Sequence, residues 1–178
     1  MEDENFDTAN IEMNEDIDTQ DIISVNRFIL LSILSFGLYG LWWMYEAWRF
    51  YKQKEKLDIM PVARTIFFIF YLDSFLDKTI KFAKQKGYED SYSNNFLFVG
   101  YFLGNLSAKL PDPFWLISIF SFVFLIPPFK ALNFAKQNSK EFITREQTSL
   151  DGKQIIILIL GIIIWIFTLK GMGGESLL

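Results

Sequence analysis

This chain has 178 residues, of which 51% are hydrophobic and 18% aromatic, and it contains neither cysteine nor histidine. The lack of thiols and imidazoles argues against haem, structural zinc and Ser–His or Cys–His catalysis. The net charge of −4 conceals two regions, because residues 1–21 hold nine acids and no base, whereas the remainder carries +5.

The acidic region predicts a disordered N-terminal tail over residues 1–25, since it has few large apolar side chains to bury. It lacks the basic start of a signal peptide. A solvated tail is the simple interpretation, and a docking segment for a basic partner is the alternative. Residues 26–171 are expected to form a helical membrane bundle, followed by a short C-terminal tail over residues 172–178.

The body contains apolar runs close to membrane-spanning length. Phe28–Tyr45 has eighteen residues without a charge, Pro113–Phe129 is similar, and Ile155–Leu169 lies between Lys153 and Lys170. Crossing about 30 Å of hydrocarbon takes roughly 17–25 helical residues. We therefore predict an all-α integral membrane protein with four to five apolar helices and amphipathic interfacial extensions.

The first run is expected to be one helix that starts after Arg27. Gly37 and Gly40 lie within it and allow close helix packing. Aromatic residues gather towards its end, where a helix leaves the apolar zone through the headgroups. Basic residues follow directly: Arg49, Lys52, Lys54 and Lys56.

The second predicted helix runs from Pro61 to about Lys86 and is ended by Gly87, which suits the residue after a helix C-terminus. Its first part, Val62–Leu76, is apolar. From Leu72 onward it is amphipathic, because the apolar residues recur every three or four positions. These residues are Leu72, Phe75, Leu76, Thr79, Ile80 and Ala83.

The third predicted helix, Asn95–Ala108, is short for a full span and carries Gly100 and Gly104, a spacing that lets two helices approach closely. The fourth is expected to start with Asp112 as N-cap and Pro113 behind it. Pro127-Pro128 should kink or interrupt that helix.

The fifth predicted helix opens at Asp151 and Gln154, which have the spacing of a capping box. It is expected to close at Lys170, where several glycines follow.

Residues 27–56, with Leu31-Ser-Ile-Leu-Ser-Phe-Gly-Leu-Tyr-Gly-Leu-Trp-Trp43 followed by Tyr45, Trp48 and Arg49, resemble the opening of a family of small bacterial membrane proteins of unknown function. A weaker similarity lies in Pro113–Asn133. The resemblance implies a multi-helix, multi-pass protein of the bacterial inner membrane. It implies no activity, cofactor or catalytic residue.

Asp73 and Asp77 are the only acid pair beside an apolar segment, and ionisable groups at membrane depth often couple to protons or ions. The competing interpretation places both at the headgroup boundary, with Asp77 paired to Lys81 one turn later. The basic residues are candidate contacts for anionic lipid headgroups. These candidates are Arg49, Lys52, Lys54, Lys56, Lys81, Lys84, Lys130 and Lys136.

We therefore expect a small, non-enzymatic interaction or accessory module without a cofactor, bound to the lipid bilayer and to an unidentified protein partner, and not to nucleic acid. A small transporter or channel component that uses Asp73 and Asp77 is the alternative, and a membrane-embedded enzyme comes third. If Val62–Leu76 stays on the cytoplasmic side, fourteen bases lie inside and three outside, as the positive-inside rule favours. This predicts four spans with both termini outside.

Overall fold

The computed structural model describes residues 19–174, with the backbone alone for 172–174. The predictions for residues 1–18 and 175–178 lie outside the described residues. The described part is mostly helical, as predicted. Its elements are β1 (Thr19–Ile22), α2 (Val25–Leu34), α3 (Leu38–Lys54), α4 (Pro61–Ile66), α5 (Phe68–Gln85), α6 (Asn94–Leu106), the 3-10 helices η1 (Ser107–Lys109) and η2 (Phe114–Leu125), α7 (Ile126–Gln137), β2 (Ile143–Glu146) and α8 (Gly152–Gly174).

The chain begins its folded part earlier than the predicted boundary at residue 25. Residues 19–22 form β1, which pairs in parallel with β2, so that Thr19 lies opposite Ile143. The Arg145 Nε donates a hydrogen bond to the Asp21 Oδ1 at 2.9 Å, which adds a charged contact between the strands. The expected tail therefore includes residues that belong to the folded body.

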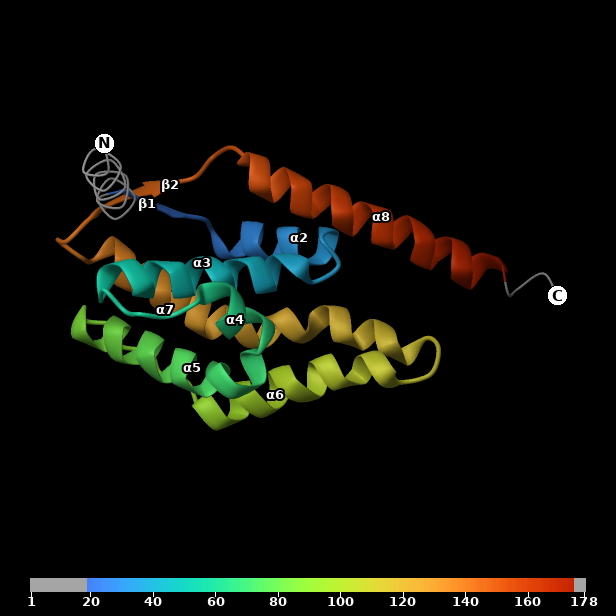
Figure 1. Ribbon diagram of the computed structural model, residues 1–178, viewed down its shortest axis with the longest axis horizontal. Helices are drawn as coiled ribbons and strands as arrows, with labels where there is room; N and C mark the ends of the chain where they lie inside the picture. Colours follow the sequence, from blue (N-terminus) through green and yellow to red (C-terminus); the bar gives the residue numbers. More distant parts are fainter. Residues whose placement is uncertain (1–18, 175–178) are drawn as a thin grey trace, which may run out of the picture.

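The first apolar run forms two antiparallel helices, α2 and α3, and the single helix that we expected is wrong (Figure 1). The turn between them has positive φ at Phe36 (59°) and Gly37 (83°), a conformation that glycine adopts without steric cost. The Tyr39 N–H donates to the Ser35 hydroxyl oxygen at 2.8 Å and so fixes the start of α3. The hairpin brings the start of α2 and the end of α3 to the same end of the molecule.

The second predicted helix is divided in two at Phe67, which separates α4 from α5. Its end is as predicted. The Tyr88 N–H donates to the Ala83 carbonyl and the Gly87 N–H to the Lys84 carbonyl, which is a Schellman motif with Gly87 at positive φ. Five residues of the predicted apolar face are buried, namely Leu72, Phe75, Leu76, Thr79 and Ala83, and Ile80 is half-buried.

Helix α6 and η2 form a second hairpin and pack closely side by side (Figure 1). A Cβ on Gly100 would lie 2.6 Å from the Phe124 Cζ, and one on Gly104 would lie 2.9 Å from the Ser121 Cβ. The two glycines thus set the distance between these helices. Gly40 on α3 similarly faces η2.

The fourth predicted helix comprises η2 and α7, and Pro127 and Pro128 lie in the first turn of α7. Proline is tolerated there because the first N–H groups of an α-helix have no intrahelical acceptor. Asp112 is not the N-cap; its carboxylate accepts a hydrogen bond from the Trp115 indole instead.

Helix α8 starts with the predicted capping box. The Gln154 N–H donates to the Asp151 Oδ1 at 2.6 Å, and the Asp151 N–H donates to the Gln154 Oε1 at 3.2 Å. Within the described residues, two helical stretches are long and apolar enough to cross a membrane, Phe114–Gln137 and Gly152–Gly171. Only a small part of the second is buried.

The core lies where four helices meet. The rings of Phe28 (α2) and Phe129 (α7) stack at a centroid distance of 4.4 Å, and the Trp43 ring (α3) lies 5.6 Å from the Phe75 ring (α5). All four side chains are buried. This aromatic cluster stabilises the relative positions of the helices that line the cavity described next.

Candidate functional site

A cavity of about 240 Å³ lies among β1, α3, α7 and the first turn of α8. Its floor contains the buried side chains of Trp43, Phe50 and Phe129, and its rim contains the exposed residues Asp21 and Lys153. Such a volume far exceeds the roughly 10–15 Å³ needed to hold one water molecule. The site therefore has an apolar floor and polar, partly exposed walls.

Glu46 lies among three basic residues that come from three different helices. The Arg49 guanidinium is 3.6 Å from the Glu46 carboxylate. Partial burial raises the pKa of Glu46, and the charges of Arg49, Lys153 and Lys136 oppose this rise by stabilising the carboxylate. The cavity thus holds one partly buried acid surrounded by cations.

Two of these cations lie over aromatic rings. The Lys136 Nζ is 4.5 Å from the centre of the Phe50 ring and donates a hydrogen bond to the Gln20 Oε1 at 3.0 Å. The Lys153 Nζ lies 5.6 Å from the centre of the Trp42 ring. Aromatic faces attract cations, so both ammonium groups are held towards the cavity walls.

Amide side chains fix the wall formed by α8. The Gln154 Nε2 donates to the Tyr39 hydroxyl at 3.1 Å and to the Gln147 Oε1 at 2.9 Å. Arg27 donates to the Gln147 carbonyl oxygen, which joins the start of α2 to the same network. The N-terminal end of α8 is therefore attached to α2 and α3 by polar contacts at the cavity rim.

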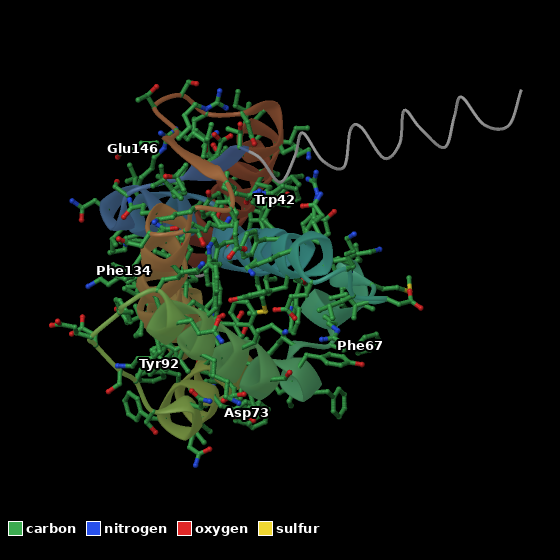
Figure 2. The ribbon with its side chains drawn as sticks, turned by 90° about the vertical axis from the view of Figure 1, so that its left-hand side faces the viewer. Trp42, Phe67, Asp73, Tyr92, Phe134 and Glu146 are labelled. Carbon is green, nitrogen blue, oxygen red and sulfur yellow. The ribbon has the colours of Figure 1, made fainter. Side chains whose placement is uncertain are left out.

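The predicted acid pair lies elsewhere. Trp42 lines the cavity, and Figure 2 shows Asp73 well away from it. Asp73 is exposed, and the Asp77 carboxylate accepts a hydrogen bond from the Lys81 Nζ at 2.7 Å. Neither acid lines the cavity.

The predicted headgroup contacts fall into three groups. Arg49 and Lys136 line the cavity, and Lys54 forms an ion pair with Glu141 at 3.0 Å. The others lie outside the cavity on exposed positions: Lys52, Lys56, Lys81, Lys84 and Lys130.

Sequence reasoning did not identify Glu46, Lys153 and Gln20 as site residues. One usable signal was present on α3, where Trp42, Glu46, Arg49 and Gln53 recur at intervals of four, three and four residues. That spacing puts them on one helix face. The residues from β1 and α8 could not be found this way, because their contacts join positions more than 100 residues apart in the chain.

Glu141 connects the segment after α7 to two helices. Its carboxylate forms ion pairs with Lys54 on α3 and with Lys86, the C-cap residue of α5. Hydrogen bonds from Lys86 and Lys54 lower the pKa of Glu141, because they stabilise its charged form. Because the pKa of Glu141 is lower in the folded than in the unfolded state, its ionised carboxylate stabilises the fold at a pH above the unfolded pKa. This stabilisation is lost as the pH falls through the pKa of the folded state.

We expect Glu141→Gln to lower the free energy of unfolding at pH 7 by no more than about 1 kcal/mol, the usual scale for a half-exposed ion pair. The difference between the variant and the wild type should shrink as the pH falls below the unfolded pKa of about 4.3, and it should disappear once the pH is below the lowered pKa of the folded carboxyl, which is then protonated as well. Thermal unfolding in detergent at several pH values measures this. A difference that persists in acid would mean that the charge of Glu141 is not the stabilising feature.

In the part of the chain that the structure describes, no group of three acids is placed to hold a metal ion. No protein-family model, curated protein or solved structure matches this chain. Any functional conclusion must therefore come from the cavity and from the surfaces around it.

Proposed function

We propose that this protein is a multi-pass membrane protein whose apolar half lies in the bilayer. The support is the exposed apolar surface of α8, of α6 with η2, and of the α4–α5 junction. Figure 1 shows α8 and the hairpin of α6 and η2 extending towards the same end of the molecule. Large exposed apolar surfaces are rare on soluble monomers and mark a membrane or protein contact. The exposed side chains include Ile155, Ile159, Ile163, Phe167, Phe96, Val99, Leu103, Ile117, Phe120, Ile66, Phe67 and Phe70.

The basic residues lie on the other half, and their separation from the apolar surface is the single observation that carries this proposal. Fourteen of the 17 lysines and arginines are on α3, the C-terminal half of α5, α7, β2, the adjoining loops, the start of α8, or at Arg27. By the positive-inside rule this half faces the cytoplasm. Only Arg64, Lys109 and Lys170 lie elsewhere.

Because α2 and α3 form a hairpin, the membrane topology that we propose differs from the four spans predicted from the sequence. Because its two arms return to the same side, α2 and α3 form a re-entrant hairpin that does not cross the bilayer. The crossings are then α6, η2 with the start of α7, and α8. This places residue 19 inside and residue 170 outside, in place of the earlier expectation of both termini outside.

In this orientation the protein acts as a non-enzymatic accessory module of the bacterial inner membrane. Its apolar half anchors it, and its basic half contacts anionic headgroups, each base near the surface contributing about 1 kcal/mol. The cavity and the exposed edge of β2 remain on the cytoplasmic side, where a protein partner can reach them. The acids Asp73 and Asp77 have no part in this function.

The orientation can be tested with single cysteines, because the chain has none of its own. In intact cells, an impermeant thiol reagent should label Lys109→Cys and Lys170→Cys. It should label Thr19→Cys and Lys84→Cys only after the cells are opened. All four positions are exposed in the structure. Labelling of Thr19→Cys in intact cells would contradict the re-entrant hairpin.

The interaction role can be tested in the same cells with a photo-cross-linking residue. Placed at Glu146, on the cytoplasmic half, it should yield one discrete adduct with another protein. Placed at Phe120, on the apolar half, it should yield lipid adducts only. Both side chains are exposed, so they form a matched pair. Equal protein adducts from both positions would contradict the assignment of the two halves.

A further inference from the structure

Arg64 on α4 is a cation without an anionic partner among the residues that the structure describes. Its guanidinium forms no hydrogen bond or ion pair with any of them. The two acids nearest to it in the sequence, Asp58 and Asp73, are exposed and are not paired with it. The described part of the chain therefore leaves the charge of Arg64 uncompensated.

Two aromatic rings hold this cation against the body of the protein. The Arg64 Cζ lies over the Trp48 ring of α3, 4.5 Å from its centre, and over the Tyr71 ring of α5, 5.0 Å from its centre. Trp48 is fully buried, so its ring is a fixed support. Aromatic faces attract cations, and the N–H donors of a guanidinium lie in the plane of the group. Contacts over the ring faces thus position the guanidinium and leave its N–H groups for oxygen acceptors.

The surface around Arg64 is apolar. Met60 and Phe67, the two cap residues of α4, lie about one helical turn before and after it and are 72% and 56% exposed. Ile66 and Phe70 are also exposed and extend this surface. In a bilayer, a lone cation beside hydrocarbon is costly unless an anion meets it. The combination suits a ligand that has both an anionic group and hydrocarbon chains.

The level of α4 in the molecule suits a lipid of the cytoplasmic leaflet. In Figure 1, α4 and the first turn of α8 lie at about the same position along the horizontal long axis. At that turn of α8, the capping residues Asp151 and Gln154 are followed by the exposed apolar surface that begins at Ile155. In the proposed orientation, this level is the boundary between headgroups and hydrocarbon on the cytoplasmic side.

We propose that Arg64 binds the phosphate of a glycerophospholipid whose acyl chains lie on Met60, Phe67 and Phe70. This inference rests on the proposed function, because it needs α4 at headgroup depth. A guanidinium can donate two parallel hydrogen bonds to the oxygens of one phosphate. The phosphate compensates the charge of Arg64, and the acyl chains cover the exposed apolar side chains beside it.

The first test measures the lipids that the detergent-purified full chain retains in native mass spectrometry. The probes are phosphatidylglycerol and a diacylglycerol that has the same acyl chains but no phosphate. We expect one molecule of phosphatidylglycerol to be retained more strongly than any further lipid, and no such retention of the diacylglycerol. Equal retention of the two probes would overturn the proposal, because the phosphate would then contribute nothing.

Variants locate this lipid at Arg64. Arg64→Gln should weaken the strongly retained phosphatidylglycerol by about tenfold or more, because charge-assisted hydrogen bonds are the strong ones. Arg64→Lys keeps the charge but not the planar donors, so its affinity should lie between those of the wild type and Arg64→Gln. Lys109→Gln is the matched control, since Lys109 is an exposed base of η1 that also lies outside the basic half.

Folding of each variant is checked by its melting temperature. If Arg64→Gln does not fold, Arg64→Lys takes its place and should still bind less tightly than the wild type. The proposal is overturned if Arg64→Gln binds as well as the wild type, if it binds as well as Arg64→Lys, or if Lys109→Gln loses as much affinity.

A photo-cross-linking residue at position Phe67 tests the occupant without changing Arg64. In intact cells it should yield adducts with the mass of a phospholipid. An adduct with another protein or with a second copy of this chain would overturn the proposal. Cysteine labelling reports the orientation separately. The expected labelling without a lipid adduct at Phe67 would refute this inference alone, whereas the opposite labelling pattern would refute the proposed function.

Discussion

Gly161→Ala is expected to destabilise the protein by about 1–3 kcal/mol, although alanine is normally the better helix former. A Cβ at this position would lie 2.5 Å from the Ser35 carbonyl carbon and 2.7 Å from the Leu34 carbonyl oxygen. These are backbone atoms, which cannot move aside without displacing the turn between α2 and α3. Thermal unfolding in detergent, followed by circular dichroism, measures the loss.

Gly171→Ala is the matched control, because it lies on the same helix and a Cβ there would meet nothing within 4 Å. It should leave the stability unchanged or raise it by up to about 1 kcal/mol. Trp165 gives a second readout, since its indole N–H donates to the Ile33 carbonyl at 3.0 Å and its ring contacts Phe36. If the fluorescence of Trp165 and the melting temperature are unchanged in Gly161→Ala, α8 does not pack on α2 as described.

Local signals in the sequence predicted two helix ends correctly, although Asp112 is not the N-cap that we expected. The capping box at Asp151 and Gln154 and the helix end at Gly87 depend on residues within one turn of each other, so the pattern contains all the information needed. The amphipathic face of α5 was found for the same reason. Periodicity over a few turns identifies which side of a helix is buried, whatever it packs against.

The hairpin of α2 and α3 could not be predicted in this way. Hydropathy counts apolar residues, and an uncharged run of eighteen residues has the same composition whether it is one long helix or two short ones. The deciding interactions are tertiary. The Phe36 ring lies 5.0 Å from Trp165 and 6.1 Å from Trp115, so residues far along the chain hold the turn in place.

The cavity was missed because its charges are distributed over distant segments. On α3 alone, Glu46 beside Arg49 is indistinguishable from an ordinary surface pair. The pair is recognisable as part of a cavity only when α7 and α8 bring Lys136 and Lys153 to the same place. The apolar surface was predictable, because it depends on composition. The cavity was not predictable, because it depends on how the helices are arranged.

Phe75→Ala is expected to cost about 3–5 kcal/mol of unfolding free energy, the range for removing a large aromatic side chain from a core. Phe75 is fully buried, and its ring lies 5.6 Å from that of Trp43 and 5.5 Å from that of Trp48. The cavity left behind cannot close easily, because rigid rings surround it and α5 is held against α7 on the other side.

Phe70→Ala on the same helix is the control for this substitution. Phe70 is 76% exposed and lies on the apolar half that we assign to the bilayer, so its removal exchanges one detergent or lipid contact for another. It should therefore change the unfolding free energy by less than about 1 kcal/mol, as surface substitutions usually do. Unfolding of both variants in the same detergent compares them directly. A loss for Phe70→Ala that equals the loss for Phe75→Ala would mean that α5 buries the opposite face, and the proposed membrane-facing surface would have to be reassigned.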